Sequence, residues 1–229
     1  MFFFYDPTWW LIIAGMILCL IASGNVNTTY RKYSKIGNAR GMSAGEVAER
    51  ILKGAGIYEV RIERIEGELT DHYDPKNKVV RLSESVYHST SVAAIGVAAH
   101  ECGHVIQHYG GYLPIRFRNA LVPVVHFGSK LSWPLILLGI LFGLTGLVDV
   151  GIILFSLALL FQLVTLPVEF NASKRAIGII KENGILQGDE IVGARKVLNA
   201  AAMTYVASTI ATALQVLRLF LLFGRRRRD

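Results

Sequence analysis

Two long apolar runs without a charged residue most constrain how this sequence can fold. They cover residues 131–147 and 150–168 and meet at the short stretch Gly146–Asp149. A helix needs about 20 apolar residues to cross a bilayer, and it satisfies its own backbone polar groups there. The two runs therefore predict a tight hairpin of membrane-spanning helices rather than a buried helical pair in a soluble protein.

A third apolar segment lies near the beginning of the chain. It covers residues 9–22, extended by residues 2–5 and 23–24, and is long enough to span. Trp9 and Trp10 are suited to the membrane–water interface. This segment predicts an N-terminal transmembrane helix, with a helix in a soluble core as the less favoured alternative.

The composition agrees with a membrane protein. Hydrophobic residues make up 52% of the chain and charged residues 18%, whereas soluble domains average about 45–50% and about 25%. The net charge is +7, but the cations cluster beside the apolar segments, where anionic lipid and topology control explain them better than nucleic acid does. We therefore expect a multi-pass protein of the cell membrane that contacts the lipid bilayer and no nucleic acid.

The distribution of Lys and Arg predicts the orientation in the membrane. Cations follow the first apolar segment and flank the base of the hairpin, whereas the hairpin tip carries only Asp149. The positive-inside rule then places the N-terminus and the tip outside, and the region between them on the cytoplasmic side. A crossing by the last apolar stretch, residues 199–223, would place Arg225–Arg228 outside. We therefore expect that stretch, which is interrupted by Arg218, to lie in the interface or pack on the domain.

Residues 41–83 have the composition of a soluble domain. Ser43 and Glu46 form a capping-box pattern that predicts a helix ending near Gly54. The alternation of residues 58–66 predicts a half-buried strand, and a second strand is expected after a turn at 71–77. Together they predict a small antiparallel sheet with residues 78–83 at its edge, where an extended peptide could pair. The candidate substrate-binding residues are Lys78, Val79, Val80, Arg81 and Leu82.

A His-Glu-x-x-His motif, residues 100–104, lies in a run that is typical of a helix between the N-cap candidates at 89–91 and Gly110. On a helix, His100 and His104 share a face and can bind one Zn²⁺. Glu101 can then act on a water at the metal as general base. A buried helix with incidental histidines is the alternative, and Cys102 is expected to pack rather than bind metal.

A catalytic zinc site usually has three protein ligands, so a third is needed. His108 is excluded because eight helical residues place it about 12 Å from His100. His72, His88, His126 and Glu169 remain possible. Glu169 has the best support because the hairpin returns the chain to the same side of the membrane, and we expect it to begin a helix there. A charge that complements the helix dipole is the alternative.

These motifs resemble a known family. The sequence AAHECGHVIQH at 98–108, RNALVPVV at 118–125 and LPVEFNASKRA at 166–176 resemble the neutral zinc metallopeptidases of bacterial membranes, over nearly the whole chain. More distantly, the chain is similar to the gluzincins that include the CAAX prenyl proteases and the heat-shock membrane protease. The resemblance implies zinc held by His100, His104 and Glu169, with Glu101 as catalytic base. The distant relatives have an Asp where this chain has Ser173, and an additional N-terminal span.

We therefore expect a mainly α membrane protein with a small antiparallel sheet and a gluzincin-like peptidase domain. Its parts are an N-terminal transmembrane helix (1–24), the peptidase domain (25–130), the transmembrane hairpin (131–168), and the third-ligand and C-terminal helices (169–229). The expected function is zinc-dependent endopeptidase activity on peptides or proteins, membrane-associated ones included. Candidate oxyanion donors are Tyr205, His72 and Tyr87.

Two other classes of function agree less well with the sequence. A non-catalytic membrane protein could retain the metal site and bind a partner, but structural zinc sites are usually closed by four protein ligands. A transporter is disfavoured because the apolar runs carry no ionisable residues that would mark a transport path.

Overall fold

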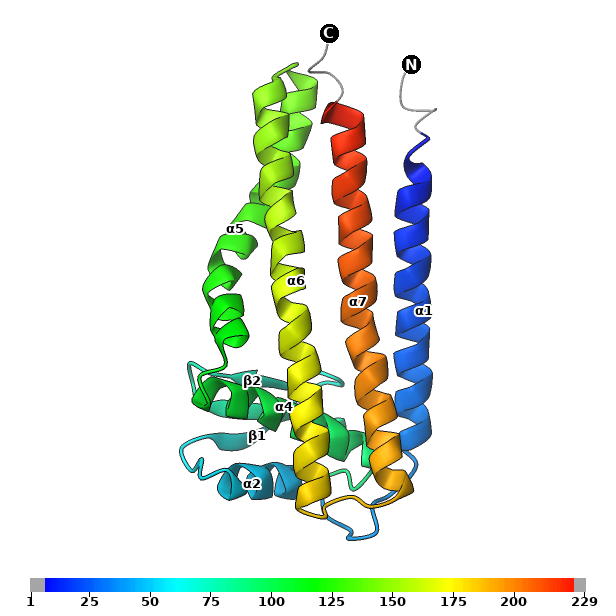
Figure 1. Cartoon of the computed structure of the whole chain (residues 1–229), viewed down its shortest axis with the longest axis vertical. Helices are drawn as coiled ribbons and strands as arrows, with labels where there is room; N and C mark the ends of the chain where they lie inside the picture. Colours follow the sequence, from blue (N-terminus) through cyan, green and yellow to red (C-terminus); the bar gives the residue numbers. More distant parts are fainter. Residues whose placement is uncertain (1–6, 225–229) are drawn as a thin grey trace. The chain divides into compact units, whose positions relative to one another are not determined.

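The computed structural model describes residues 7–224, which divide into two compact units. The apolar unit comprises residues up to Ser23, Arg116–Leu166 and residues from Thr204 onward. The motif unit comprises Gly24–Ile115 and Pro167–Met203 and contains the His-Glu-x-x-His motif. Four helices contribute residues to both units (Figure 1): α1 (Trp9–Tyr33), α5 (Leu113–Leu141), α6 (Thr145–Glu182) and α7 (Asp189–Phe223).

Four helices are long and apolar enough to cross a membrane: α1, α6, α7 and α5 (Leu113–Leu141). No more than 22% of the most apolar window of any of them is buried, which leaves apolar surface for lipid. The predicted hairpin is confirmed, but its turn lies at Phe142–Leu144 instead of Gly146–Asp149. Gly143 accounts for the earlier turn because its φ of 68° reverses the chain.

The last helix, α7, is a single helix of 35 residues. Inside the apolar unit, the Arg218 guanidinium lies 5.2 Å from the centre of the Trp9 ring, so an aromatic face partly compensates its charge. The presence of Arg218 therefore disfavours a membrane crossing by α7 less strongly than the sequence indicated. That α7 does not cross stays a prediction.

The motif unit is built around α4 (Val92–Tyr109), the helix that carries the motif. Its predicted start is confirmed because the Ser91 hydroxyl accepts a hydrogen bond from the Ala94 amide. The predicted capping box of α2 (Ala44–Gly54) is also present, formed by Ser43 and Glu46. Both helices bury their apolar faces in one core, and the short helix α3 (Glu84–Tyr87) packs on α4 beside them.

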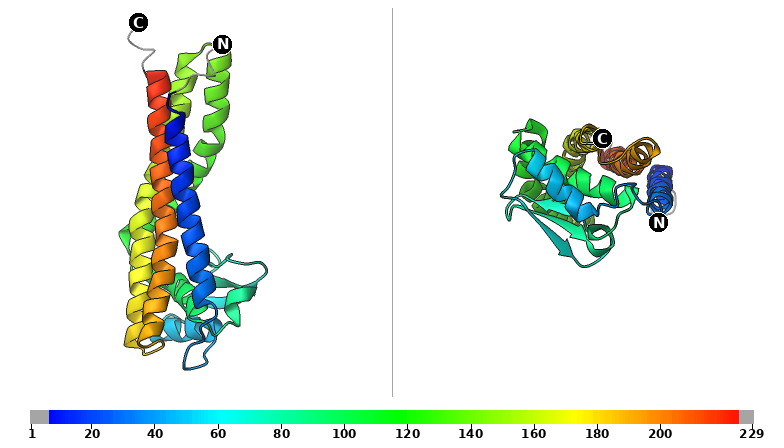
Figure 2. Two further views of the ribbon diagram at one scale, coloured as in Figure 1. Left: turned by 90° about the vertical axis from the view of Figure 1, so that its right-hand side faces the viewer. Right: turned by 90° about the horizontal axis from the view of Figure 1, so that it is seen from below.

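The sheet has three strands in the order β1-β3-β2 (Figure 2). β1 (Arg61–Ile65) is parallel to β3 (Val79–Ser83), and β2 (His72–Asp74) is antiparallel to it. The small sheet is confirmed, but it is mixed: the expected antiparallel pairing holds for β2 with β3 and is wrong for β1 with β3. Part of the expected turn at 71–77 is the strand β2, which takes the antiparallel position beside β3 and leaves β1 to pair on the other side.

The predicted edge strand was also wrong. β3 is the central strand, so its backbone is paired on both sides and cannot add a substrate strand. Its side chains are engaged as well: Val79, Val80 and Leu82 are fully buried, and the Arg81 guanidinium donates to the Asp74 carboxylate at 2.9 Å. Residues 78–82 therefore build the sheet and do not form an exposed peptide-binding edge.

Candidate metal centre

The candidate metal centre lies where α4 approaches the part of α6 that belongs to the motif unit. The prediction that Glu169 begins a helix was wrong. Helix α6 runs without a break from Thr145 to Glu182, with Pro167 inside it. Proline removes one backbone hydrogen bond, a cost that long apolar helices tolerate when neighbouring groups compensate. Glu169 consequently projects from the interior of a helix and is only 3% exposed.

Gly103, between the motif's two histidines, allows this close approach. A Cβ atom built on Gly103 would lie 2.7 Å from the backbone oxygen of Ala172 in α6. Because the neighbour is backbone, it cannot rotate away, and any larger residue would separate the helices. The absence of a side chain at position 103 therefore brings Glu169 within reach of both histidines.

Gly103→Ala is expected to destabilise the protein by about 1–3 kcal/mol, the usual cost of overpacking a tight contact. Thermal unfolding of the detergent-solubilised protein measures this loss. Gly178→Ala in α6 is the matched control because a Cβ there would meet nothing closer than 4.0 Å, so the replacement should be neutral or stabilising. Equal unfolding midpoints for the two variants would contradict the close contact at Gly103.

Three side chains converge on one point: His100, His104 and Glu169. One ligand atom from each lies within 4.8 Å of the others. The Glu169 Oε2 atom is 3.2 Å from His100 Nε2 and 3.6 Å from His104 Nε2. The structure thus brings together the three residues that the sequence suggested as ligands.

These distances fit a shared zinc ion. Ligand atoms about 2.0–2.2 Å from a tetrahedral zinc are about 3.3–3.6 Å apart, close to the two distances given above. The tautomer of His104 supports the same conclusion. The side-chain amide of Gln107 donates to the Val168 carbonyl at 2.8 Å, so its oxygen faces His104 Nδ1 at 3.0 Å. The Nδ1 atom therefore carries a proton, and in the neutral imidazole the lone pair of Nε2 is directed toward Glu169.

His100 is held in the same way by Ser173, whose hydroxyl lies 3.1 Å from His100 Nδ1. Ser173 lies on α6, one helical turn beyond Glu169. Both imidazoles therefore have a partner at Nδ1 and present Nε2 to a common point. Metal-binding histidines usually have such a partner, which orients the ring.

Gln107 is itself part of a chain of hydrogen bonds. Its amide nitrogen also lies 3.0 Å from Asn171 Oδ1, and Arg175 Nε donates to that same oxygen at 2.7 Å. Gln107 is fully buried. Its orientation is therefore fixed by two partners on α6, and it in turn fixes His104.

Glu101 is the remaining member of the motif. It is 9% exposed, and within residues 7–224 its carboxylate has no hydrogen-bond or ion-pair partner in the protein. A nearly buried carboxylate without a partner is costly, so a ligand or water is expected to contact it. Its negative charge also affects neighbouring groups: burial first, and then Glu101, raise the pKa of both Cys102 and Asp71.

Cys102 behaves as the sequence predicted. It is fully buried and its thiol points toward the Ala48 carbonyl, 3.6 Å away, while the raised pKa disfavours the thiolate that metal binding requires. Asp71 was not singled out by the sequence. Its carboxylate accepts hydrogen bonds from the amide and hydroxyl of Ser83 and ties the start of β2 to the end of β3.

The other candidate histidines are outside the cluster. Within residues 7–224, the group of possible metal ligands consists only of the three residues named above. His72 Nδ1 lies 2.8 Å from the Thr70 carbonyl, and His88 contacts the Tyr87 ring. His108 contacts the Tyr73 hydroxyl at 3.3 Å, consistent with its exclusion by distance along the helix.

The oxyanion candidates stay predictions. Tyr87 packs on α2 at Gly45, and His72 is exposed on β2. Tyr205 belongs to the apolar unit and His126 does too, so neither is placed relative to the metal centre.

Comparison with known proteins identifies the family. The model of the family described as "Putative neutral zinc metallopeptidase" matches residues 8–224. The chain belongs to this family. It is also 46% identical to the "Putative membrane protease YugP" of Bacillus subtilis (strain 168), over 93% of this chain and 95% of that protein. No solved structure matches the chain. The more distant similarity to CAAX prenyl proteases stays a prediction.

Gln107 is a residue of the site that the sequence analysis missed, although its position pointed to a contact with His104. It follows His104 by three residues, a spacing that places both on one helix face. Its partners Val168, Asn171 and Arg175 could not be paired with it from sequence because they depend on the approach of α6.

Gln107→Met is expected to lower the affinity for zinc about 10–100-fold, the usual effect of losing a group that orients a metal-binding histidine. Methionine keeps a similar length, but its thioether is only a weak acceptor for a hydrogen bond from His104 Nδ1. Competition with a chromogenic zinc chelator measures the affinity. Gln187→Met, at an exposed position, is the control and should leave it unchanged; an equal affinity for Gln107→Met would show that Gln107 does not hold His104.

Proposed function

We propose that this protein is an integral-membrane zinc endopeptidase in which His100, His104 and Glu169 hold the metal and Glu101 is the general base. The observation that carries the proposal is the pairing of a three-ligand cluster with a nearly buried carboxylate that has no partner among residues 7–224. Three ligands leave one zinc position open, as in catalytic sites.

A zinc ion bound there would polarise a peptide carbonyl and make a bound water more acidic. Glu101 would accept the proton of the attacking water while the water oxygen bonds to the carbonyl carbon. It would then deliver that proton to the amine nitrogen as the carbon–nitrogen bond breaks. Gln107 and Ser173 would keep both imidazoles oriented throughout the reaction. They contact the rings at Nδ1 and so leave Nε2 of each ring available to the metal.

The burial of Glu169 supports its role as a ligand rather than a surface charge. A carboxylate that is 3% exposed is stable only with compensating positive charge or hydrogen-bond donors. If Nε2 of His104 carries no proton, Glu169 faces a lone pair there, and a cation between them removes the repulsion. Neutral imidazoles and an ionised carboxylate are also the forms that bind zinc.

We further propose that the substrates are peptides or proteins, membrane-associated ones included, and that the motif unit lies on the cytoplasmic side. The excess of Lys and Arg beside the apolar segments supports this orientation. Cysteines introduced one at a time at 53 and at 146, with Cys19 and Cys102 replaced by Ser, are labelled in intact cells and in lysed cells to test it. Reaction at 146 but not at 53 in intact cells is expected; the reverse pattern would contradict the orientation.

Zinc removal tests the proposed activity directly. The purified protein in mild detergent should contain zinc and cleave unfolded casein. Treatment with 1,10-phenanthroline should reduce cleavage to background, and zinc should restore it, because no other group of the cluster can polarise the carbonyl. Full zinc content without cleavage of casein or of membrane peptides would instead support a non-catalytic protein that binds a partner.

A further inference from the structure

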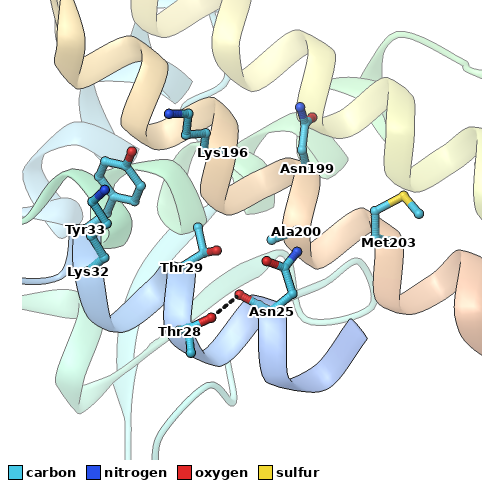
Figure 3. Close-up of a pocket in the computed structure, with 9 residues that line it drawn as sticks. All are labelled: Asn25, Thr28, Thr29, Lys32, Tyr33, Lys196, Asn199, Ala200 and Met203. Atoms are coloured by element: carbon cyan, nitrogen blue, oxygen red, sulfur yellow. Dashed lines mark hydrogen bonds between the residues drawn. The ribbon is translucent and has the colours of Figure 1, made fainter. Parts of the chain in front are cut away.

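A polar groove lies away from the metal centre, between the last turns of α1 and the first half of α7 (Figure 3). All of its lining residues belong to the motif unit, and its volume is about 440 Å³. That volume is within the range of about 300–1,000 Å³ typical of small-ligand sites. The lining residues from α1 are Asn25, Thr28, Thr29, Lys32 and Tyr33, and those from α7 are Lys196, Asn199, Ala200 and Met203.

The lining is rich in hydrogen-bond donors and positive charge. Lys32 and Lys196 contribute one ammonium group from each helix, and neither forms an ion pair with a carboxylate in the part of the chain that the structure describes. Both lysines lie at one end of the groove, and the amides of Asn25 and Asn199 lie farther along it toward Met203 (Figure 3). No acidic side chain is among the described lining residues. This chemistry suits an oxyanion, above all a phosphate group.

The position of the groove along both helices indicates where the phosphate comes from. In α1 the apolar segment ends at Ala22, and Asn25 follows within one turn. In α7 the polar lining ends at Met203, and the apolar stretch continues to Phe223. Both helices are long and apolar enough to span a membrane. The groove therefore lies at the boundary between the polar and the apolar part of each helix. Such a boundary suits the depth of lipid headgroups, whether α7 crosses the membrane or lies in its interface.

We propose that this groove binds the phosphate headgroup of an anionic phospholipid. The phosphodiester would lie between the ammonium groups of Lys32 and Lys196, and the amides of Asn25 and Asn199 would donate to its oxygens or to the glycerol headgroup. The acyl chains would leave the groove at its Met203 end. Met203, at the apolar end of the groove, suits contact with the first methylene groups of a chain. Binding here is independent of the peptidase chemistry, so it can be tested whether or not casein is cleaved.

Native mass spectrometry of the full-length protein with phosphatidylglycerol measures the binding. The double variant Lys32→Gln/Lys196→Gln should raise the apparent Kd about 30-fold, because each lysine near a membrane surface contributes about 1 kcal/mol and 1.4 kcal/mol is tenfold in affinity. The matched control is Arg31→Gln/Arg195→Gln, which removes the same charge from the neighbouring positions outside the groove. Its Kd should change only a fewfold.

Two further arms identify the ligand. Phosphatidylcholine should bind wild-type protein much more weakly than phosphatidylglycerol, and inorganic phosphate at millimolar concentration should not displace phosphatidylglycerol. Displacement by inorganic phosphate would make the ligand a free phosphate and overturn the lipid assignment. Equal loss of binding in both double variants would show that general surface charge, not the groove, attracts the lipid. The unfolding midpoints of both variants without lipid should match wild type, since all four side chains are exposed.

Discussion

Replacing Glu101 with Gln is expected to abolish casein cleavage while zinc remains bound. Glutamine has nearly the same shape but cannot accept a proton from water, and loss of general acid–base catalysis costs about 10²–10⁴-fold in rate. Since Glu101 is not one of the three clustered ligands, the metal site keeps its donors. Cleavage rates and zinc content of the same purified sample measure both parts of this prediction.

Glu49→Gln is the matched control for this experiment. Glu49 is an exposed partner of Lys53 on α2, so the same chemical change there should leave cleavage and zinc content unchanged. Proteolysis by a zinc-replete Glu101→Gln protein at the wild-type rate would exclude Glu101 as the base. Loss of zinc together with activity would mean that Glu101 acts on the metal rather than on the water.

Replacing Glu169 with Gln is expected to cost the protein its zinc. The replacement removes the only carboxylate of the cluster and leaves two neutral imidazoles with a weak amide oxygen. The loss of affinity should exceed the about 10–100-fold that follows when only an orienting group is removed. Zinc content after dialysis against a chelator, together with the thermal unfolding midpoint with and without added zinc, measures it.

The control is Glu182→Gln, at the exposed end of the same helix. It should retain zinc as wild type does. If Glu169→Gln also retained zinc through the same dialysis, the third ligand would have to be another residue, and the assignment of Glu169 would be wrong. Zinc-dependent stabilisation of wild type but not of Glu169→Gln is the expected pattern.

The motif helix and its neighbours could be predicted from sequence because their signals are local. Ser91 and Gly110 bound α4, Ser43 and Glu46 cap α2, and the i, i+4 spacing alone places His100 and His104 on one face. The candidate third ligand also came from local information, a carboxylate following a charge-free run. That the three residues converge is observed in the structure; that they bind zinc stays a prediction.

The sheet could not be predicted in the same way. Whether β1 is parallel or antiparallel to β3 depends on β2, a strand of three residues within what looked like a turn. Asp74 is a residue type typical of turns, and it does form one: its carboxylate accepts hydrogen bonds from the amides of Lys76 and Asn77. The turn directly follows β2, so the sequence signal for the turn concealed the strand. The central position of β3, and with it the failure of the proposed peptide-binding edge, follows from this one strand.

The environment of the ligands depends on packing rather than on sequence distance. The sequence around Gly103 does not indicate that this residue contacts another helix. Its contact with Ala172 is seen only in the folded structure. The same approach of two helices brings Ser173 to His100 and the Val168 carbonyl to Gln107. Long-range pairs of this kind, about 60–75 residues apart, are set by the tertiary fold alone.

The most direct test of the metal centre is X-ray absorption spectroscopy at the zinc edge on the zinc-loaded, full-length protein. We expect two imidazole nitrogens and at least one carboxylate oxygen at about 2.0–2.2 Å, with the imidazole signal lost in a His100→Ala/His104→Ala variant and the carboxylate contribution altered in Glu169→Gln. A sulfur ligand at about 2.3 Å, or a spectrum unchanged by these substitutions, would contradict the assignment of His100, His104 and Glu169 as the zinc ligands.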